Sequence, residues 1–277
     1  MTGSPQQDGH ATAELVVLGS GGRAPTRMRA VSSYLLRSRH GNLLLDPGEG
    51  TLRQMTLMGL SGSRIAAIFI SNHRLDHCLG LPSILQHQQP TVERPIDILF
   101  PRTSSAAMEN LLQLAACAET AGIRLRPLDD GAVSDNGALL HVRGLAHEIP
   151  TLGLRWQADG VAFAFVPDTA PCAGARELAR DADLLLCQAD DLHNRAAIVR
   201  SRGLMTAREA AELARDAGAR RLLLSHFQPG HEEPSAFMHE ARTTFHRSEV
   251  ARDLTSYAVT PMHDATAPSA VACDAEP

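Results

Sequence analysis

Runs of apolar β-forming residues alternate with segments of helical periodicity along most of the chain. The N-terminal part predicts three strands, in "ELVVLGSGG", "SSYLLRS" and "NLLLD", and the first of them ends in a glycine turn. Helical spacing follows in "GEGTLRQMTLMG", and "IAAIFIS" predicts a further buried strand. A helix should begin at "DHCLGLPSILQHQ", so the polar segment before it lies where a strand gives way to a helix.

The second half of the chain repeats this alternation. It predicts a helix over 104–122 and strands in "IDILF", "ALLHVRGLAH", "TLGLRW", "VAFAFVPDT", "DLLLCQ" and "RRLLLSHFQPGH". Thr206 and Glu209 form a capping box that begins another helix, and Gly218 ends it. Two similar halves of strands and helices predict paired sheets covered by helices.

Composition favours one folded domain with polar ends. With 277 residues, 44% of them hydrophobic, the chain can bury a large core, and we expect a single domain over 14–262. Residues 1–13 and 263–277 are polar or rich in Ala, Pro and acids, and are predicted to be disordered. Scattered cysteines, no signal-peptide pattern and no apolar stretch of about 18 residues predict a cytoplasmic protein without a membrane span. A homodimer is left open.

The charge of the chain argues against a nucleic-acid partner. The formal net charge is -5, and the isoelectric point is about 6.2. Such a chain has no overall positive field to attract a phosphate backbone at physiological salt. We therefore expect a small-molecule substrate.

Metal-type side chains stand where four apolar strands end, in "IFISNHRLDH", "GLAHEIP", "FAFVPDT" and "LLLSHF". Taken singly, a strand-end His is usually a hydrogen-bonded or solvent-facing residue, and an Asp before Thr is usually a cap or turn residue. Loops at strand ends, however, are where a scaffold brings together ligands that are far apart in sequence. Their combination predicts a metal site.

The order and wording of these segments resemble the metallo-β-lactamase superfamily, and within it the ribonuclease Z branch. The likeness runs over nearly the whole chain, from "VVLGSGGRAPTRMRAVSSYLL" through "LLLDPGEGTLRQM", "DHCLGLP" and "PDTAPC" to "LLLSHFQP". It implies an α/β fold, an αββα sandwich with the active site along one edge between the sheets. Asp46 and Gly48 would line the floor of that site.

The chain departs from the metal-binding motif of this family. Relatives with two metals carry HxHxDH, and the six positions here are Asn72, His73, Arg74, Leu75, Asp76 and His77. His73 is displaced by one place and should point to the other side of the segment. By the resemblance, the first metal site keeps only His147 and Asp168. The second keeps four ligands, Asp76, His77, Asp168 and His226.

Four N/O ligands suit zinc, so we expect one zinc ion in the second site, although iron and manganese also suit these ligands. One subclass of metallo-β-lactamases also works with Asn at the first position. Arg74 places a fixed cation about where the first metal would be, which discourages a second ion. Asp76 or His147 is the candidate base, and Arg74 would hold developing negative charge. Asn72, His73, Asp46 and Gln188 are expected to line the site.

Two auxiliary features of the ribonuclease Z branch are missing. Its two proton-transfer motifs read "LCQAD" and "GLMT" here, and neither Gln188 nor Leu204 can carry a proton at neutral pH. The long tRNA-grasping arm is absent between the strands that carry His147 and Asp168. The sequence thus predicts that tRNA 3′ processing is lost.

Three functions remain from the sequence. The first is a mononuclear hydrolase of a small or medium anionic ester, lactone, thioester or phosphodiester. The second is a non-hydrolytic cyclase, lyase or isomerase of specialised metabolism, and the third is a catalytically inactive binding protein. Metal content would separate the third from the others, and incorporation of water oxygen into product would separate the first from the second.

Overall fold

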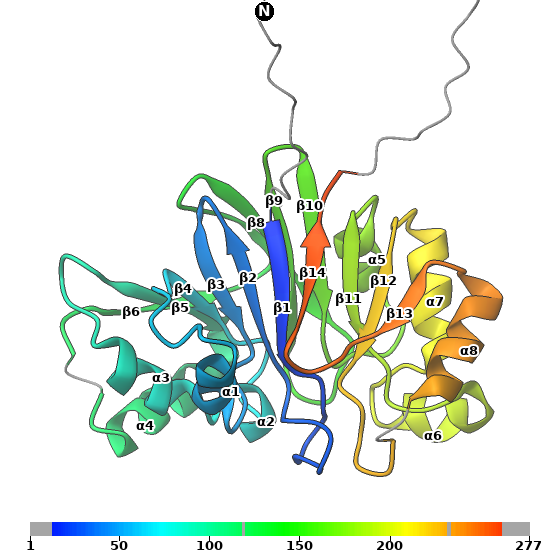
Figure 1. The fold of residues 1–277 in the computed structure, drawn as a ribbon, viewed down its shortest axis with the longest axis horizontal. Helices are drawn as coiled ribbons and strands as arrows, with labels where there is room; N and C mark the ends of the chain where they lie inside the picture. Colours follow the sequence, from blue (N-terminus) through cyan, green and yellow to red (C-terminus); the bar gives the residue numbers. More distant parts are fainter. Residues whose placement is uncertain (1–12, 118–119, 232–233, 262–277) are drawn as a thin grey trace, which may run out of the picture.

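The computed structural model describes residues 13–117, 120–231 and 234–261. Figure 1 shows two sheets packed face to face, with helices on the outer side of each. This layering confirms the predicted αββα sandwich. The predicted disordered ends, 1–13 and 263–277, lie outside the described residues except for Ala13, which begins the first strand.

The first sheet has seven strands. In spatial order they are β14 (Thr255–Val259), β1 (Ala13–Gly19), β2 (Ser33–Ser38), β3 (Gly41–Leu45), β4 (Ala67–Phe69), β5 (Ile96–Pro101) and β6 (Ile123–Leu128). Strands β14 to β3 pair antiparallel, whereas β3 to β6 pair parallel. Helices cover its outer face: α1 (Thr51–Leu57), α3 (Leu81–Gln88) and α4 (Ser105–Leu114).

The second sheet also has seven strands. In spatial order they are β13 (Ser248–Val250), β12 (Leu222–Ser225), β11 (Leu184–Gln188), β10 (Val161–Val166), β9 (Thr151–Ala158), β8 (Ala138–Leu145) and β7 (Gly131–Asp135). Its outer helices are α5 (Ala173–Ala179), α7 (Ala207–Asp216) and α8 (Ser235–Thr244). Strands β9 and β10 are joined directly by Asp159 and Gly160, both at positive φ, so no arm is inserted there.

The main core lies between the sheets. Tyr34 and Phe69 from the first sheet face Phe165 from the second, with ring centroids 5.6 and 6.5 Å from the Phe165 ring. Apolar side chains alternate along these strands, so each sheet presents one face to the other and one to its helices. The burial of both faces explains why many strands read as continuous apolar runs.

Helix boundaries depart from the sequence prediction at two places. The helix predicted over 104–122 is shorter, because a 3-10 turn (Arg102–Ser104) precedes α4, and Ala116, at φ 53°, leaves the helical conformation soon after α4 ends. The helix predicted from Asp76 is split into α2 (Leu75–Cys78) and α3. The split lies at Gly80, where a Cβ atom would come within 2.2 Å of the Gly48 carbonyl oxygen.

The capping box is present as predicted. Thr206 accepts a hydrogen bond from the backbone N–H of Glu209, and the Glu209 carboxylate accepts one from the backbone N–H of Thr206. Gly218 follows the helix at φ 71°. A short helix, α6 (Ala196–Ser201), precedes α7. None of the helices among the described residues combines the length and apolar character that a membrane crossing requires.

Candidate metal centre

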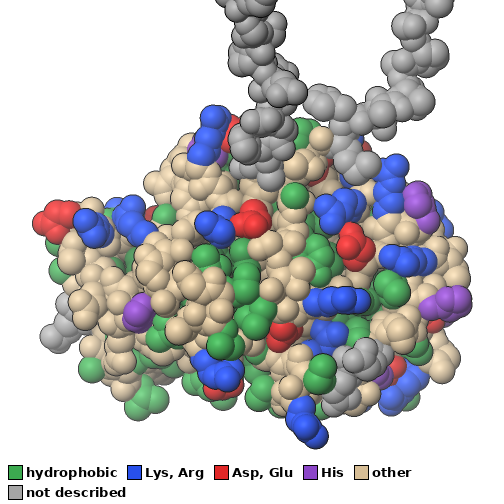
Figure 2. Space-filling model, viewed as in Figure 1, with side chains coloured by type: hydrophobic (Ala, Val, Ile, Leu, Met, Phe, Trp, Pro, Cys, Tyr) green, Lys and Arg blue, Asp and Glu red, His purple; other side chains and the backbone are tan. Residues whose placement is uncertain are grey.

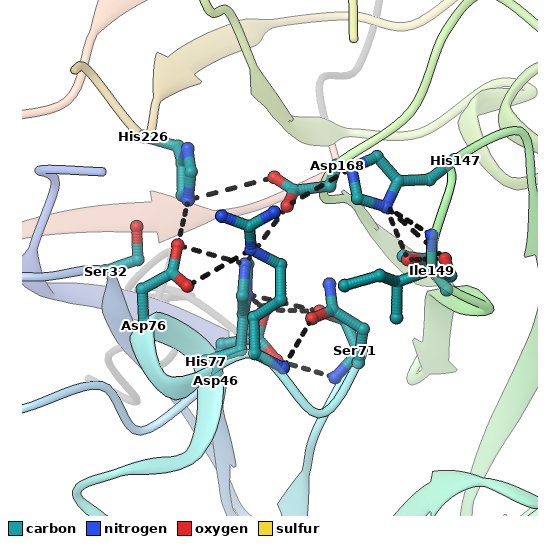
Figure 3. Close-up of polar contacts among 12 residues, drawn as sticks. Ser32, Asp46, Ser71, Asp76, His77, His147, Ile149, Asp168 and His226 are labelled. Carbon is teal, nitrogen blue, oxygen red and sulfur yellow. Dashed lines mark hydrogen bonds and ion pairs between the residues drawn. The ribbon is translucent and has the colours of Figure 1, made fainter. Parts of the chain in front are cut away.

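The predicted ligands meet at one edge of the sandwich, because each follows the end of a different strand. His147 follows β8, Asp168 follows β10 and His226 follows β12, all in the second sheet. Asp76 and His77 come from α2, which follows β4 of the first sheet. Figure 3 shows these side chains directed toward a common centre between the two sheets.

Asp46 orients the His77 ring by a hydrogen bond to the ring nitrogen that faces away from this centre. The Oδ2 atom of Asp46 lies 2.7 Å from Nδ1 of His77 and accepts its hydrogen bond, while both side chains are buried. Ser71 donates to the same carboxylate through its backbone N–H, at 2.7 Å, and its Oγ, at 2.6 Å. With Nδ1 engaged in this way, the His77 ring presents Nε2 to the centre, as is common for histidines that bind metals.

Three residues place ligand atoms close together. One atom each from Asp76, His77 and His226 lies within 4.8 Å of the others, and all three residues are buried. The His77 and His226 rings stack, with centroids 5.3 Å apart. Asp168 lies beside them, since its carboxylate oxygens are 3.3 Å from Nε2 of His77 and 3.8 Å from Nε2 of His226. These distances are longer than those of good hydrogen bonds. The four side chains therefore surround a gap that their direct contacts do not close.

Buried polar atoms at this gap lack hydrogen-bond partners within the described residues. They include Oδ2 of Asp76, Oδ1 of Asp168, Nε2 of His147 and both ring nitrogens of His226. Orphaned buried polar atoms are costly, and each such group in a native fold requires an explanation. A divalent cation would satisfy most of them, and this N/O donor set is of the kind that zinc binds. The residues present therefore fit a metal ion.

Two site residues have an unusual backbone. Asp46 and His226 adopt positive φ angles of 43° and 66°, which residues other than glycine rarely adopt. Such strain persists where the surrounding structure imposes it, and it concentrates at functional sites. Here it holds the Asp46 carboxylate against Nδ1 of His77 and places the His226 ring among the ligands.

The mutual charges shift the ionisation of the cluster. Burial raises the pKa of Asp168, but the facing His226 and His77 outweigh burial and hold that pKa well below its usual range. The pKa of Asp76 is lowered in the same way, against burial, by His226 and His77. Burial lowers the pKa of His77, yet Asp46 and Asp168 raise it well above its ordinary value. Without a cation, the site holds its charges as ion pairs.

The half of the site that the resemblance assigns to a first metal is built differently. Asn72 is fully buried, and its Oδ1 accepts a hydrogen bond from the Arg74 backbone N–H at 2.9 Å. Nε of Arg74 lies 3.4 Å from Oδ1 of Asp76, and Nη1 lies 3.6 Å from the exposed carboxylate of Glu148. His147 approaches Asp168 to 3.9 Å. Arg74 is thus turned toward a ligand of the second site.

The remaining predicted lining residues differ in placement. His73 does not line the site as expected: its Nδ1 lies 3.0 Å from Oγ of Ser104, because its displacement by one position turns the side chain away from the ligands. Gln188 is buried, lines a small pocket with His77 and His226, and has no partner for either amide atom within the described chain.

Sequence reasoning missed several polar groups of the site. The Tyr34 hydroxyl lies 2.8 Å from Oγ of Ser225 in the pocket beside Gln188, and no motif marks it. Burial raises its pKa well above the usual range. Ser71 and Glu148, each adjacent to a recognised segment, could have been found from that adjacency.

Comparisons with known proteins show what the sequence and the fold of this chain resemble. A family model described as "Beta-lactamase superfamily domain" matches residues 41–227. Ribonuclease Z of Streptomyces coelicolor is 34% identical over 87% of this chain and 96% of its own length. Ribonuclease Z of Protochlamydia amoebophila is 31% identical, over 89% and 97%.

Solved structures share the fold. The Bacillus subtilis protein YhfI aligns with a TM-score of 0.77 and 19% identity, over 88% of this chain and 98% of its own. The short form of human tRNase Z aligns with a TM-score of 0.74 and 24% identity, over 90% and 100%.

The relatives correct two predictions from the sequence. The exclusion of tRNA 3′ processing and of a nucleic-acid partner is wrong, because proteins named ribonuclease Z match almost end to end. The small-molecule functions are withdrawn with it. The net charge was a poor guide to nucleic-acid binding because it sums the charges of the whole chain. Figure 2 shows that arginines lie among the acidic residues on one face of the molecule. Contact with a phosphate backbone needs only local cations, such as Arg74 at the site and Arg202 beside Asp190.

Proposed function

We propose, on the premise that this chain belongs to the metallo-β-lactamase superfamily and to its ribonuclease Z branch, that it is a metal-dependent hydrolase of RNA phosphodiester bonds. The proposed substrate is precursor tRNA, cleaved at its 3′ end. One observation carries the proposal: ligand atoms of Asp76, His77 and His226 converge within 4.8 Å at the sandwich edge.

The proposed cofactor is one zinc ion held by Asp76, His77, Asp168 and His226, with iron or manganese as substitutes that suit the same ligands. When bound, such a cation polarises the scissile phosphoryl group and acidifies water. Asn72 and Arg74 support a single ion, since they replace two histidine ligands with an amide and a fixed cation.

His147 is the proposed acceptor of the proton that the attacking water loses. Its Nδ1 lies 3.3 Å from both the carbonyl oxygen and the backbone nitrogen of Ile149, and the proposed role requires the tautomer in which Nδ1 donates to the carbonyl and Nε2 carries the lone pair. That Nε2 is buried, has no hydrogen-bond partner within the described residues, and lies 3.9 Å from Asp168. Asp76 is the second candidate, through Oδ1, because Oδ2 faces Nε2 of His77 and of His226 and would bind the ion.

The test is cleavage of a precursor tRNA with a 3′ trailer by purified, zinc-loaded protein. We expect site-specific cleavage near the 3′ end, and loss of at least about a hundredfold in rate for His147→Ala, as for removal of a general base. The control is His141→Ala, a partly buried histidine on β8 outside the site. Failure of the zinc-loaded protein to cut any precursor tRNA or single-stranded RNA would refute the proposal.

A further inference from the structure

We propose that Asn72 and Arg74 form an anion site that binds a non-bridging phosphoryl oxygen of the substrate beside the metal ligands. This inference rests on the proposed function, because it names the substrate group that this half of the site receives. It differs from a two-metal arrangement, in which the same space holds a second cation. Three observations support it: Nδ2 of Asn72 has no acceptor, the Arg74 guanidinium makes only long contacts, and the Glu148 carboxylate that it contacts is exposed.

Asn72 supplies the unpartnered donor. Its side chain is fully buried, and Oδ1 is used by the Arg74 backbone N–H at 2.9 Å. Its Nδ2 has no hydrogen-bond partner within the described residues. Because Oδ1 already has a donor and Nδ2 has no acceptor, the group that is missing beside this buried amide is an acceptor. A cation is thereby disfavoured, and an anionic oxygen is favoured.

Arg74 supplies the positive charge. Its side chain is only 16% exposed, and its contacts with Asp76 and Glu148 are 3.4 and 3.6 Å long. Charge-assisted hydrogen bonds of good geometry are about 2.7–2.9 Å. The guanidinium therefore keeps donors for a further acceptor, and its planar fork matches two oxygens of a phosphate. The same fixed charge repels a second metal ion.

Glu148 behaves as an exchangeable partner. Its side chain is 63% exposed, in contrast to Asp76, which is buried among the metal ligands. An exposed carboxylate at 3.6 Å gains little from this pairing. A substrate phosphoryl group that enters the site can take its place on Arg74, so Glu148 competes with the substrate for the guanidinium.

The test is calorimetric binding of inorganic phosphate to the zinc-loaded protein, with metal content measured on the same samples. We expect Arg74→Met to keep its zinc and to bind phosphate about tenfold more weakly or worse, since bonds to charged groups are lost. Arg74→Lys should recover only part of that affinity, because the fork is lost. Arg37→Met is the matched control, because Arg37 pairs with Glu14 on the strands at a distance from the site, and it should change neither quantity.

Glu148→Gln tests the competition directly. It should bind phosphate more tightly than the unaltered protein, whereas Glu177→Gln, which removes another exposed carboxylate paired with an arginine, should not. Loss of zinc in both Arg74 variants would make Arg74 a positioning residue for Asp76 and overturn the anion site. Unchanged phosphate affinity in both would overturn it as well. Affinity that depends on Arg74 in a protein without RNA cleavage would uphold the anion site and refute the proposed function.

Discussion

Nδ1 of His77 and Oδ2 of Asp46 are 2.7 Å apart and buried, so a carboxylate outside the ligand cluster determines which nitrogen of His77 faces the centre. Asp46→Asn should weaken zinc binding about 10- to 100-fold, the usual effect of losing such an orienting partner. Competition with a chromogenic chelator measures it. Asp97→Asn is the control, because Asp97 is also buried but pairs with Arg124 and Arg126. Equal zinc affinity in Asp46→Asn and the parent would contradict this role.

Elemental analysis should find about one zinc per chain, because only the second set of ligands is complete. His226→Ala should release the ion, since His226 supplies one of the three atoms that lie within 4.8 Å of one another. His231→Ala, next to the same loop but paired with Asp191, should retain it. Two tightly held ions in the parent protein would be inconsistent with a single site.

Stability should depend on pH differently with and without zinc. His77 has a pKa well above 6.5, so in the metal-free protein its stabilisation is full below pH 6.5 and declines as pH rises through the raised pKa. The lowered pKa values of Asp76 and Asp168 give stabilisation that is present above pH 3.8 and is lost on further acidification. The zinc-loaded protein should instead gain stability as pH rises toward 6.5 and level off above it, because zinc holds His77 neutral while the unfolded chain binds a proton there only at lower pH.

Thermal unfolding scans between pH 4 and pH 9, with and without zinc, check these slopes. If the stability of the two forms changed with pH in parallel, His77 would not lose a proton when the ion binds. His77→Gln serves as the control, since its metal-free form should lose the decline above pH 6.5.

Thr206→Ala should destabilise the protein by about 1 kcal/mol, the usual cost of losing an N-cap. The capping hydroxyl accepts from Glu209 N–H in α7, whose inner face packs against the second sheet. Thr243→Ala, on the exposed side of α8, should change stability by less than about 0.5 kcal/mol. Urea unfolding of both variants measures the difference, and equal midpoints would show that the cap contributes nothing.

The sequence predicted the parts of the fold that local patterns encode. The apolar β-forming stretches became β1 to β5 and β8 to β12, and the capping box of Thr206 and Glu209 became the start of α7. Strands β6, β7, β13 and β14 were missed, because polar residues interrupt their apolar pattern and each is defined by pairing with a neighbouring strand, as β14 is by β1, far away in sequence. The end of α4 was missed because Ala-rich sequence continues beyond it, and only the backbone of Ala116 marks the stop.

The candidate site was predicted as a set of residues but not as a geometry. Metal-type residues at strand ends could be recognised because parallel neighbours end at one edge. The contacts of Arg74 with Asp76 and Glu148 depend on the side-chain path from the start of α2, which no periodicity specifies. Tyr34 reaches the pocket from β2 only because the two sheets stack. Its position beside Ser225 could therefore not be predicted from its neighbours in sequence.

The convergence of ligands from both sheets has a mechanical consequence. Asp76 and His77 belong to the first sheet, and Asp168 and His226 to the second, with 91 positions separating His77 from Asp168. An ion held by all four would act as a cross-link between the two halves of the folded chain, and its binding free energy would stabilise that state. Removing the ion with a chelator should therefore separate the two sheets at this edge first. The core between the sheets should be lost only later, on global unfolding.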